Sequence, residues 1–241
     1  MRRIVQTPKR MLEEISTRWP MILDPAQFVL RYAPAIEGYL LALVRNPDMV
    51  DEIRQDFLLR MLQKGFVAPQ NIKGRFRNYL QAAVRNAAIS HLRRKAPAQT
   101  EPEALAQLPD ATSEPAIEKE WLDQWRQCVT ERVWAALELH ERQNPNNHAY
   151  TVLRIFVDHQ AQEDSEQLAQ RVSQRLKKPL RADAFRKQLS RARRLFAKLT
   201  VQEVVQTIED PTPERIEEEL IDLGLLTTIQ PFLPSNWRKQ R

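Results

Sequence analysis

The sequence predicts an all-α protein, with two small helical domains joined by a flexible acidic linker. The chain of 241 residues contains 4 glycines and 16 prolines, and few stretches show the period-two alternation of a strand. Apolar residues recur instead at steps of three and four, the spacing that places them on one face of a helix. The prolines fall mostly between these stretches, where we expect the connections.

Composition narrows the class of protein further. A hydrophobic content of 42% with 28% charged residues is ordinary for a globular chain. No apolar run approaches the roughly 18 residues of a membrane-spanning helix, and the first residues lack the apolar segment of an export signal. We therefore expect a cytoplasmic protein that does not associate with membranes. Because Cys128 is the single cysteine and the four histidines show no ligand spacing, we expect no metal and no other cofactor.

Residues 1–21 are predicted to form an N-terminal extension, with a short helix over 11–19, and residues 22–95 the first helical domain. Asp24 and Pro25 are a favoured cap and first-turn pair for a helix over 26–44, which Pro34 would kink or split. A further helix is predicted over 49–64, ended by Gly65. Its inward residues are Val50, Ile53, Phe57, Leu58, Met61 and Leu62, and its polar outer face carries Asp51, Glu52, Arg54, Gln55, Asp56 and Arg60.

The next helix, over 73–95, contains no acidic residue. Its predicted buried stripe consists of Phe76, Leu80, Ala83, Val84 and Ala87. The remaining faces are predicted to form a continuous positive surface with Arg75, Arg77, Asn78, Tyr79, Arg85, Asn86, His91, Arg93, Arg94 and Lys95. Such a surface fits a polyanion, although a solvated basic face on an ordinary core helix would look the same.

Residues 96–117 are rich in proline, alanine, glutamine and acidic residues, which is typical of a linker. The second domain, over 118–200, is predicted to begin with a helix over 118–143 whose stripe includes Trp121, Trp125, Val129, Val133 and Leu137. A helix over 149–159, with Val152, Leu153, Phe156 and Val157 inward, gives this half of the chain a core of its own.

Two short helices joined by a proline-containing turn then predict a helix-turn-helix. Asp164 and Ser165 cap the first helix, residues 177–180 form the turn, and the second helix runs from Arg181 through Phe196. The stripe of the second helix is Phe185, Leu189, Ala192, Phe196 and Leu199. Its outward face carries Asp183, Lys187, Ser190, Arg191 and Arg194, and Arg186 flanks them. Such a helix fits the major groove of DNA, but the motif also occurs in folds that bind no nucleic acid.

Residues 201–241 are predicted to form an acidic C-terminal extension. Thr212 and Pro213 cap a short helix that carries Ile216, Leu220 and Leu223 inward and ends at Gly224. We expect this helix to pack on the C-terminal domain, with a regulatory or self-masking role as the alternative.

Two segments resemble a known family. The run from Val50 to Leu62, followed by Phe76-Arg-Asn-Tyr-Leu, Val84-Arg-Asn and Ser90-His-Leu-Arg-Arg94, resembles region 2 of the extracytoplasmic-function (ECF) sigma factors of bacterial RNA polymerase. Tyr79 replaces the usual Trp there, and Ser90 stands where the family commonly has Asp. The run from Ala184 to Arg193 is similar to the recognition helix of region 4, with Ala-Phe in place of Thr-Val, and the turn before it is longer than usual and lacks the common Gly.

The resemblance implies a sigma factor that binds core RNA polymerase and directs promoter recognition for transcription initiation. It implies core-polymerase contacts through Asp51, Glu52, Arg54, Gln55, Asp56 and Arg60. It places recognition of the downstream promoter element and strand opening in the loop over 66–73 and the basic helix behind it. The candidate residues there are Phe66, Asn71, Arg75, Arg77, Asn78, Arg85, Asn86, Arg93 and Arg94. The resemblance does not identify Phe66, for which a hydrophobic plug of the domain is the alternative role. Recognition of the upstream element falls on Arg181, Arg186, Lys187, Ser190, Arg191 and Arg194. Partners are then core polymerase and promoter DNA, and an anti-sigma factor or other regulator is also compatible.

Two other binding functions stay open, whereas no pattern indicates an enzyme. The carboxylates lie in solvated runs or in the linker, and the sequence contains no Gly-rich phosphate loop. One alternative is a free-standing helix-turn-helix regulator, for which we find no sustained heptad to form a dimer. The other is an adaptor whose two basic helices bind RNA.

Overall fold

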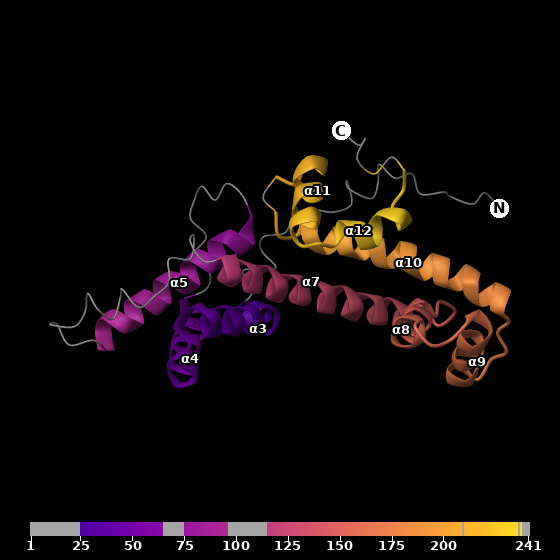
Figure 1. The fold of residues 1–241 in the computed structure, drawn as a ribbon, viewed down its shortest axis with the longest axis horizontal. Coiled ribbons are helices and arrows are strands. Elements are labelled where there is room, and N and C mark those ends of the chain that lie inside the picture. The colour runs from indigo at the N-terminus through magenta and orange to yellow at the C-terminus, as the bar shows by residue number, and fades with distance from the viewer. Residues whose placement is uncertain (1–24, 65–74, 96–114, 209, 236, 238–241) are drawn as a thin grey trace. The chain divides into compact units, whose positions relative to one another are not determined.

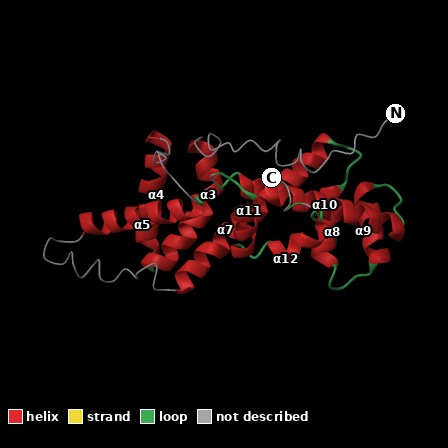
Figure 2. Cartoon of the chain, turned by 90° about the horizontal axis from the view of Figure 1, so that it is seen from above, coloured by secondary structure: helices red, strands yellow, loops and turns green. Residues whose placement is uncertain are grey.

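The computed structural model describes residues 25–64, 75–95, 115–208, 210–235 and 237. These residues form α-helices joined by turns, which confirms the all-α prediction (Figure 2). The helices are α3 (Pro25–Val44), α4 (Pro47–Lys64), α5 (Phe76–Lys95), α7 (Pro115–Gln143), α8 (Ala149–His159), α9 (Ser165–Leu176), α10 (Ala182–Val205), α11 (Pro213–Asp222) and α12 (Leu226–Ile229), followed by the 3-10 turn η1 (Gln230–Phe232). The predicted extension over 1–21 with its helix over 11–19, the loop over 66–73 and most of the linker lie outside the described residues.

The described chain divides into two compact units, and the division differs from the predicted domains. The first unit contains α3, α4, α5, the residues of α7 up to Cys128, and residues 205–223 with α11. The second contains residues 129–204, 224–235 and 237. The acidic helix α11 therefore belongs with the N-terminal helices, and the expectation that it packs on the C-terminal domain was wrong.

The first unit is built on α3, α4 and α5 (Figure 1). Helix α3 runs through Pro34 as one helix, neither split nor ended there. Its buried face consists of Phe28, Tyr32, Ala35, Ile36, Tyr39, Leu40 and Leu43. Gly38 allows a close approach to α7, since a Cβ at this position would lie 2.7 Å from Cγ of Gln124.

The first turns of α7 complete the core of this unit. Trp121 and Trp125, predicted to belong to the second domain, are instead fully buried here. The Trp125 ring stacks on Tyr32 at a centroid distance of 4.9 Å, and Trp121 meets Tyr39 edge-on at 5.3 Å. The helix begins at Pro115 rather than after the predicted linker end at 117, since proline suits the first position of a helix and Ile117 is buried.

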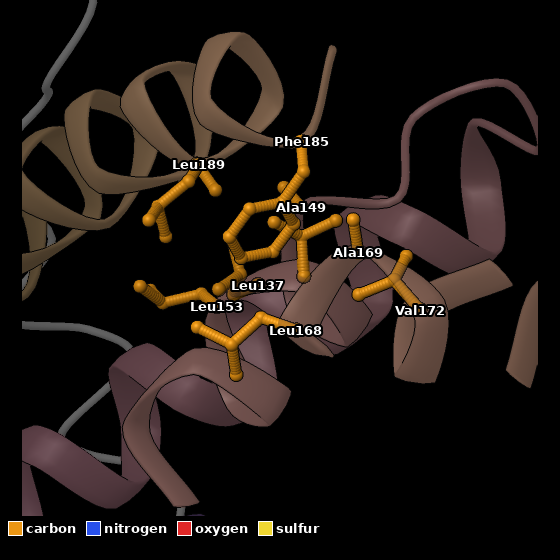
Figure 3. Close-up of a cluster of buried hydrophobic side chains, with 10 residues drawn as sticks. Leu137, Ala149, Leu153, Leu168, Ala169, Val172, Phe185 and Leu189 are labelled. Carbon is orange, nitrogen blue, oxygen red and sulfur yellow. The ribbon is translucent and has the colours of Figure 1, made fainter. Parts of the chain in front are cut away.

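The second unit is organised around one hydrophobic cluster (Figure 3). Its members come from the later part of α7 and from α8, α9 and α10: Leu137, Ala149, Val152, Leu153, Leu168, Ala169, Val172, Phe185, Leu189 and Ala192. The buried residues of α9 and the predicted stripe of α10 thus share one core. Helix α10 continues to Val205, well beyond the predicted end, because Ala197, Val201 and Val204 extend its buried stripe.

Four predicted orientations were wrong. Leu62 and Val157, expected to face inward, are 48% and 45% exposed. Arg77 and His91, expected on the positive surface, are buried at 4% and 7% exposure. The spacing accounts for the last two, because Arg77 precedes the buried Val84 by seven residues and His91 follows it by seven, which is close to two full turns of helix.

Candidate polymerase and nucleic-acid interfaces

The outer face of α4 combines charged and apolar side chains. Asp51, Glu52, Gln55 and Asp56 are exposed as predicted, whereas Arg54 and Arg60 are half-buried. Leu59, which the sequence patterns did not single out, is 53% exposed on the same arc as Glu52 and Leu62. Its position seven residues after Glu52 is the signal that could have revealed it. An exposed leucine pair rimmed by charges is the type of surface that binds another protein.

Several charges of this face are paired within the unit. Arg54 bonds Glu37 at 3.0 Å and also pairs with Asp51. Asp56 accepts a bond of 3.1 Å from Arg94 and lies 3.5 Å from Arg60. Lys95 pairs with Glu52, and the buried His91 lies 3.2 Å from the same carboxylate. The predicted polymerase face on α4 and the basic end of α5 are therefore one connected network.

The pKa of the Glu52 carboxyl is lowered below its ordinary value, first by the hydrogen bond from Lys95 and also by the positive charge of Lys95. Because this pKa is lower in the folded unit than in the unfolded chain, the ionised Glu52 stabilises the folded unit at pH values above the unfolded pKa. This contribution is lost as the pH falls through the folded pKa. We expect Lys95→Gln to raise the pKa of Glu52 and to shift acid unfolding of this unit slightly toward higher pH. Carboxyl NMR titration measures the shift, and an unchanged Glu52 pKa would show that Lys95 does not hold this carboxylate.

The basic helix α5 exposes only part of its predicted positive surface. Asn78, Asn86, Arg93, Arg94 and Lys95 are exposed, and Arg85 is half-buried. Burial raises the pKa of the Tyr39 hydroxyl, and nearby Arg85 opposes that rise. The three cations at the end of the helix also lie where the helix dipole favours positive charge. Phe66 and Asn71 lie outside the described residues.

The start of α5 is covered by α11. Arg75 and Arg77 both form ion pairs with Glu219 and Asp222. The two acidic residues follow the arginines by more than 140 positions, and the sequence patterns did not connect them. Two of the predicted DNA-binding arginines are therefore already bound to carboxylates.

In the second unit, α9 and α10 are joined by a short turn with an ordered structure. Asp164 caps α9 as predicted, and the structure adds a capping box with Gln167. Lys177 takes the left-handed conformation, with φ 52°, at the end of the helix. The Ser173 hydroxyl donates to Ala169 O at 2.8 Å and accepts from Leu180 N at 2.8 Å. Ser173, which the sequence patterns did not single out, thus ties the turn to α9.

The polar face of α10 is presented to solvent. Arg181, Asp183, Arg186, Lys187, Arg191 and Arg194 are exposed, and Ser190 is half-buried. The opposite face holds Phe185, Leu189 and Ala192 in the cluster of Figure 3. The arrangement can present a cationic helix to a groove or to a phosphate backbone.

The described residues contain no group of histidine, cysteine or acidic side chains that could hold a metal ion. Among the same residues, no helix is both long and apolar enough to cross a membrane.

These positions can be compared with known proteins. Residues 28–97 match the family model for sigma-70 region 2. The matched segment contains the helices α4 and α5 and nearly all of α3. It therefore includes the outer face of α4 and the basic surface of α5. The match supports a sigma factor of the sigma-70 family, with a role in promoter recognition by RNA polymerase. No curated protein and no solved structure matches the chain.

Proposed function

We propose that the chain is a sigma factor of the ECF type, which binds core RNA polymerase and reads a promoter at two places. The observation that carries the proposal is the region 2 match over α3, α4 and α5, with an α9–turn–α10 pair downstream whose cationic face is exposed. In this proposal, α4 docks on core polymerase, the exposed cations of α5 and the loop before it bind the opened downstream element, and α10 binds the upstream element. The protein then works in the cytoplasm and carries out no reaction itself.

Strand opening distinguishes this function from the alternatives. A holoenzyme made from bacterial core polymerase and this chain is expected to open a cognate promoter, so that unpaired thymines react with permanganate. A free-standing regulator or an RNA adaptor would leave core polymerase unable to open that DNA. Genomic fragments selected by the holoenzyme supply the promoter, and core polymerase alone is the control.

For α10, we expect Lys187→Ala with Arg191→Ala to weaken binding of duplex DNA. Each lost phosphate contact should reduce the salt dependence of binding by about 0.9 units of slope, so the pair should reduce it by nearly two. Anisotropy titrations of a labelled duplex over a range of salt measure both effects. Arg142→Ala with Arg154→Ala removes the same charge from exposed positions of α7 and α8 and is the control. An equal loss in both variants would argue against α10 as the contacting helix.

A further inference from the structure

The start of α5 and the helix α11 share a cluster of charge-assisted hydrogen bonds. Nε of Arg77 donates to both carboxylate oxygens of Glu219, at 2.9 and 3.1 Å, and Nη2 donates to Asp222 at 2.8 Å. Nε of Arg75 lies 2.9 Å from Glu219, and the same guanidinium pairs with Asp222 and, at 3.5 Å, with Glu218. Both arginines therefore bind more than one carboxylate oxygen, the arrangement in which arginine pairs are strongest.

Residues 207 and 208, which precede α11, also contact the start of α5 through backbone hydrogen bonds. The Phe76 amide donates to Thr207 O at 3.0 Å, and Arg75 forms an antiparallel bridge with Ile208. Glu219 is 1% exposed and Arg77 is 4% exposed. While α11 stays in place, a phosphate group in solution cannot reach the Arg77 guanidinium.

Carboxylates and phosphates present the same kind of acceptor to arginine, whose planar group binds either of them through two parallel hydrogen bonds. We propose that Arg75 and Arg77 form a binding site for the phosphates of single-stranded DNA, and that α11 fills this site with its carboxylates in the isolated chain. The inference rests on the proposed function, because it gives α5 a nucleic-acid ligand. It adds that the C-terminal segment of the same chain competes for that ligand.

The two sides of α11 are held differently. Ile216, Leu220 and Leu223 are buried at 0–1% exposure, which anchors the helix by its apolar face. On the polar edge, the side chains of Asp222 and Glu218 are 40% and 66% exposed. Competing phosphates can therefore enter at this edge, beside Arg75, and water and salt screen this part of the cluster. Neutralising the carboxylates removes the polar part of this attachment, so α11 should leave the two arginines more readily.

The test uses the full chain with Glu219→Gln and Asp222→Asn, and a fluorescent oligothymidylate of about 20 nucleotides as the probe. We expect several-fold tighter binding by anisotropy, with a salt dependence steeper by roughly 1.4 units, since each of the two arginines gains a phosphate contact that contributes about 0.7 on a single strand. Glu138→Gln with Asp158→Asn makes the same chemical change at a half-buried and an exposed helix position and controls for net charge. An equal gain in the control would overturn the proposal.

The gain must also depend on the two arginines. In a chain that carries Arg75→Gln and Arg77→Gln, the carboxylate substitutions should produce no further gain in affinity. If the variant with Glu219→Gln and Asp222→Asn has unchanged affinity for oligothymidylate and a lowered melting temperature, the cluster only stabilises the fold.

Hydrogen exchange in the unmodified chain gives a readout that needs no variant. Saturating oligothymidylate should speed exchange of the α11 amides if α11 is displaced, and unchanged exchange at saturation would overturn the proposal. Assembly with core polymerase is measured separately, so that failure of the proposed function is distinguishable from failure of the masking.

Discussion

Leu59→Asp is expected to reduce the affinity of the chain for core polymerase by about 10- to 100-fold. Burying a leucine side chain stabilises an interface by roughly 1.5–3 kcal/mol, and every 1.4 kcal/mol changes a dissociation constant about tenfold. Leu59 is 53% exposed on α4, so the substitution should leave the fold intact. The measurement is a titration of labelled chain with core polymerase, accompanied by circular dichroism to confirm helical content.

Leu139→Asp is the matched control, because Leu139 is also a helix residue and is 54% exposed, but lies on α7 in the second unit. Gln55→Ala should weaken the same contact to a smaller extent, since Gln55 is exposed on the same arc as Leu59. Asp56 is a poorer probe, because its carboxylate also pairs with Arg94 and Arg60. Unchanged affinity of Leu59→Asp for core polymerase would show that the polymerase contacts another surface of the chain.

Phe185→Ala is expected to destabilise the second unit by about 3–5 kcal/mol and to abolish binding of duplex DNA. Phe185 is 1% exposed and lies in the cluster through which α10 packs on α9 (Figure 3). Removing the ring leaves a cavity where the two helices meet, so α10 loses its fixed orientation. For a unit of this size, the loss should lower the melting temperature by more than about 10 °C.

The matched control is Lys187→Ala on the same helix, which should weaken duplex binding with little change in melting temperature because Lys187 is exposed. Phe185→Leu keeps most of the buried volume and should recover most of the stability. Thermal unfolding followed by circular dichroism measures all three variants. An unchanged transition in Phe185→Ala would contradict a helix-turn-helix held together by this cluster.

Local signals in the sequence predicted most of the secondary structure. Asp164 with Ser165 marks the start of α9, and Thr212 with Pro213 marks the start of α11. The bounds of α8 are those predicted. Each of these features depends on residues a few positions apart, and periodicity and capping report on that range.

Contacts between distant segments were not predictable in this way. Arg77 and Glu219 are separated by 142 residues, and a basic helix and an acidic helix each look solvent-exposed when taken alone. Trp121 and Trp125 follow a linker in the sequence but pack against the aromatic side chains of α3, and the stripe they form is the same in either location. Periodicity shows which face of a helix is buried, but it does not show which segment covers that face.

The central claim is that this chain is a dissociable subunit of RNA polymerase, and a binding titration with purified bacterial core polymerase tests it most directly. The account predicts a saturable one-to-one complex at submicromolar concentration, which an excess of another sigma factor displaces because both occupy the same site. Absence of such a complex, for a chain that is folded and binds duplex DNA, would contradict the account and leave a free-standing regulator in its place.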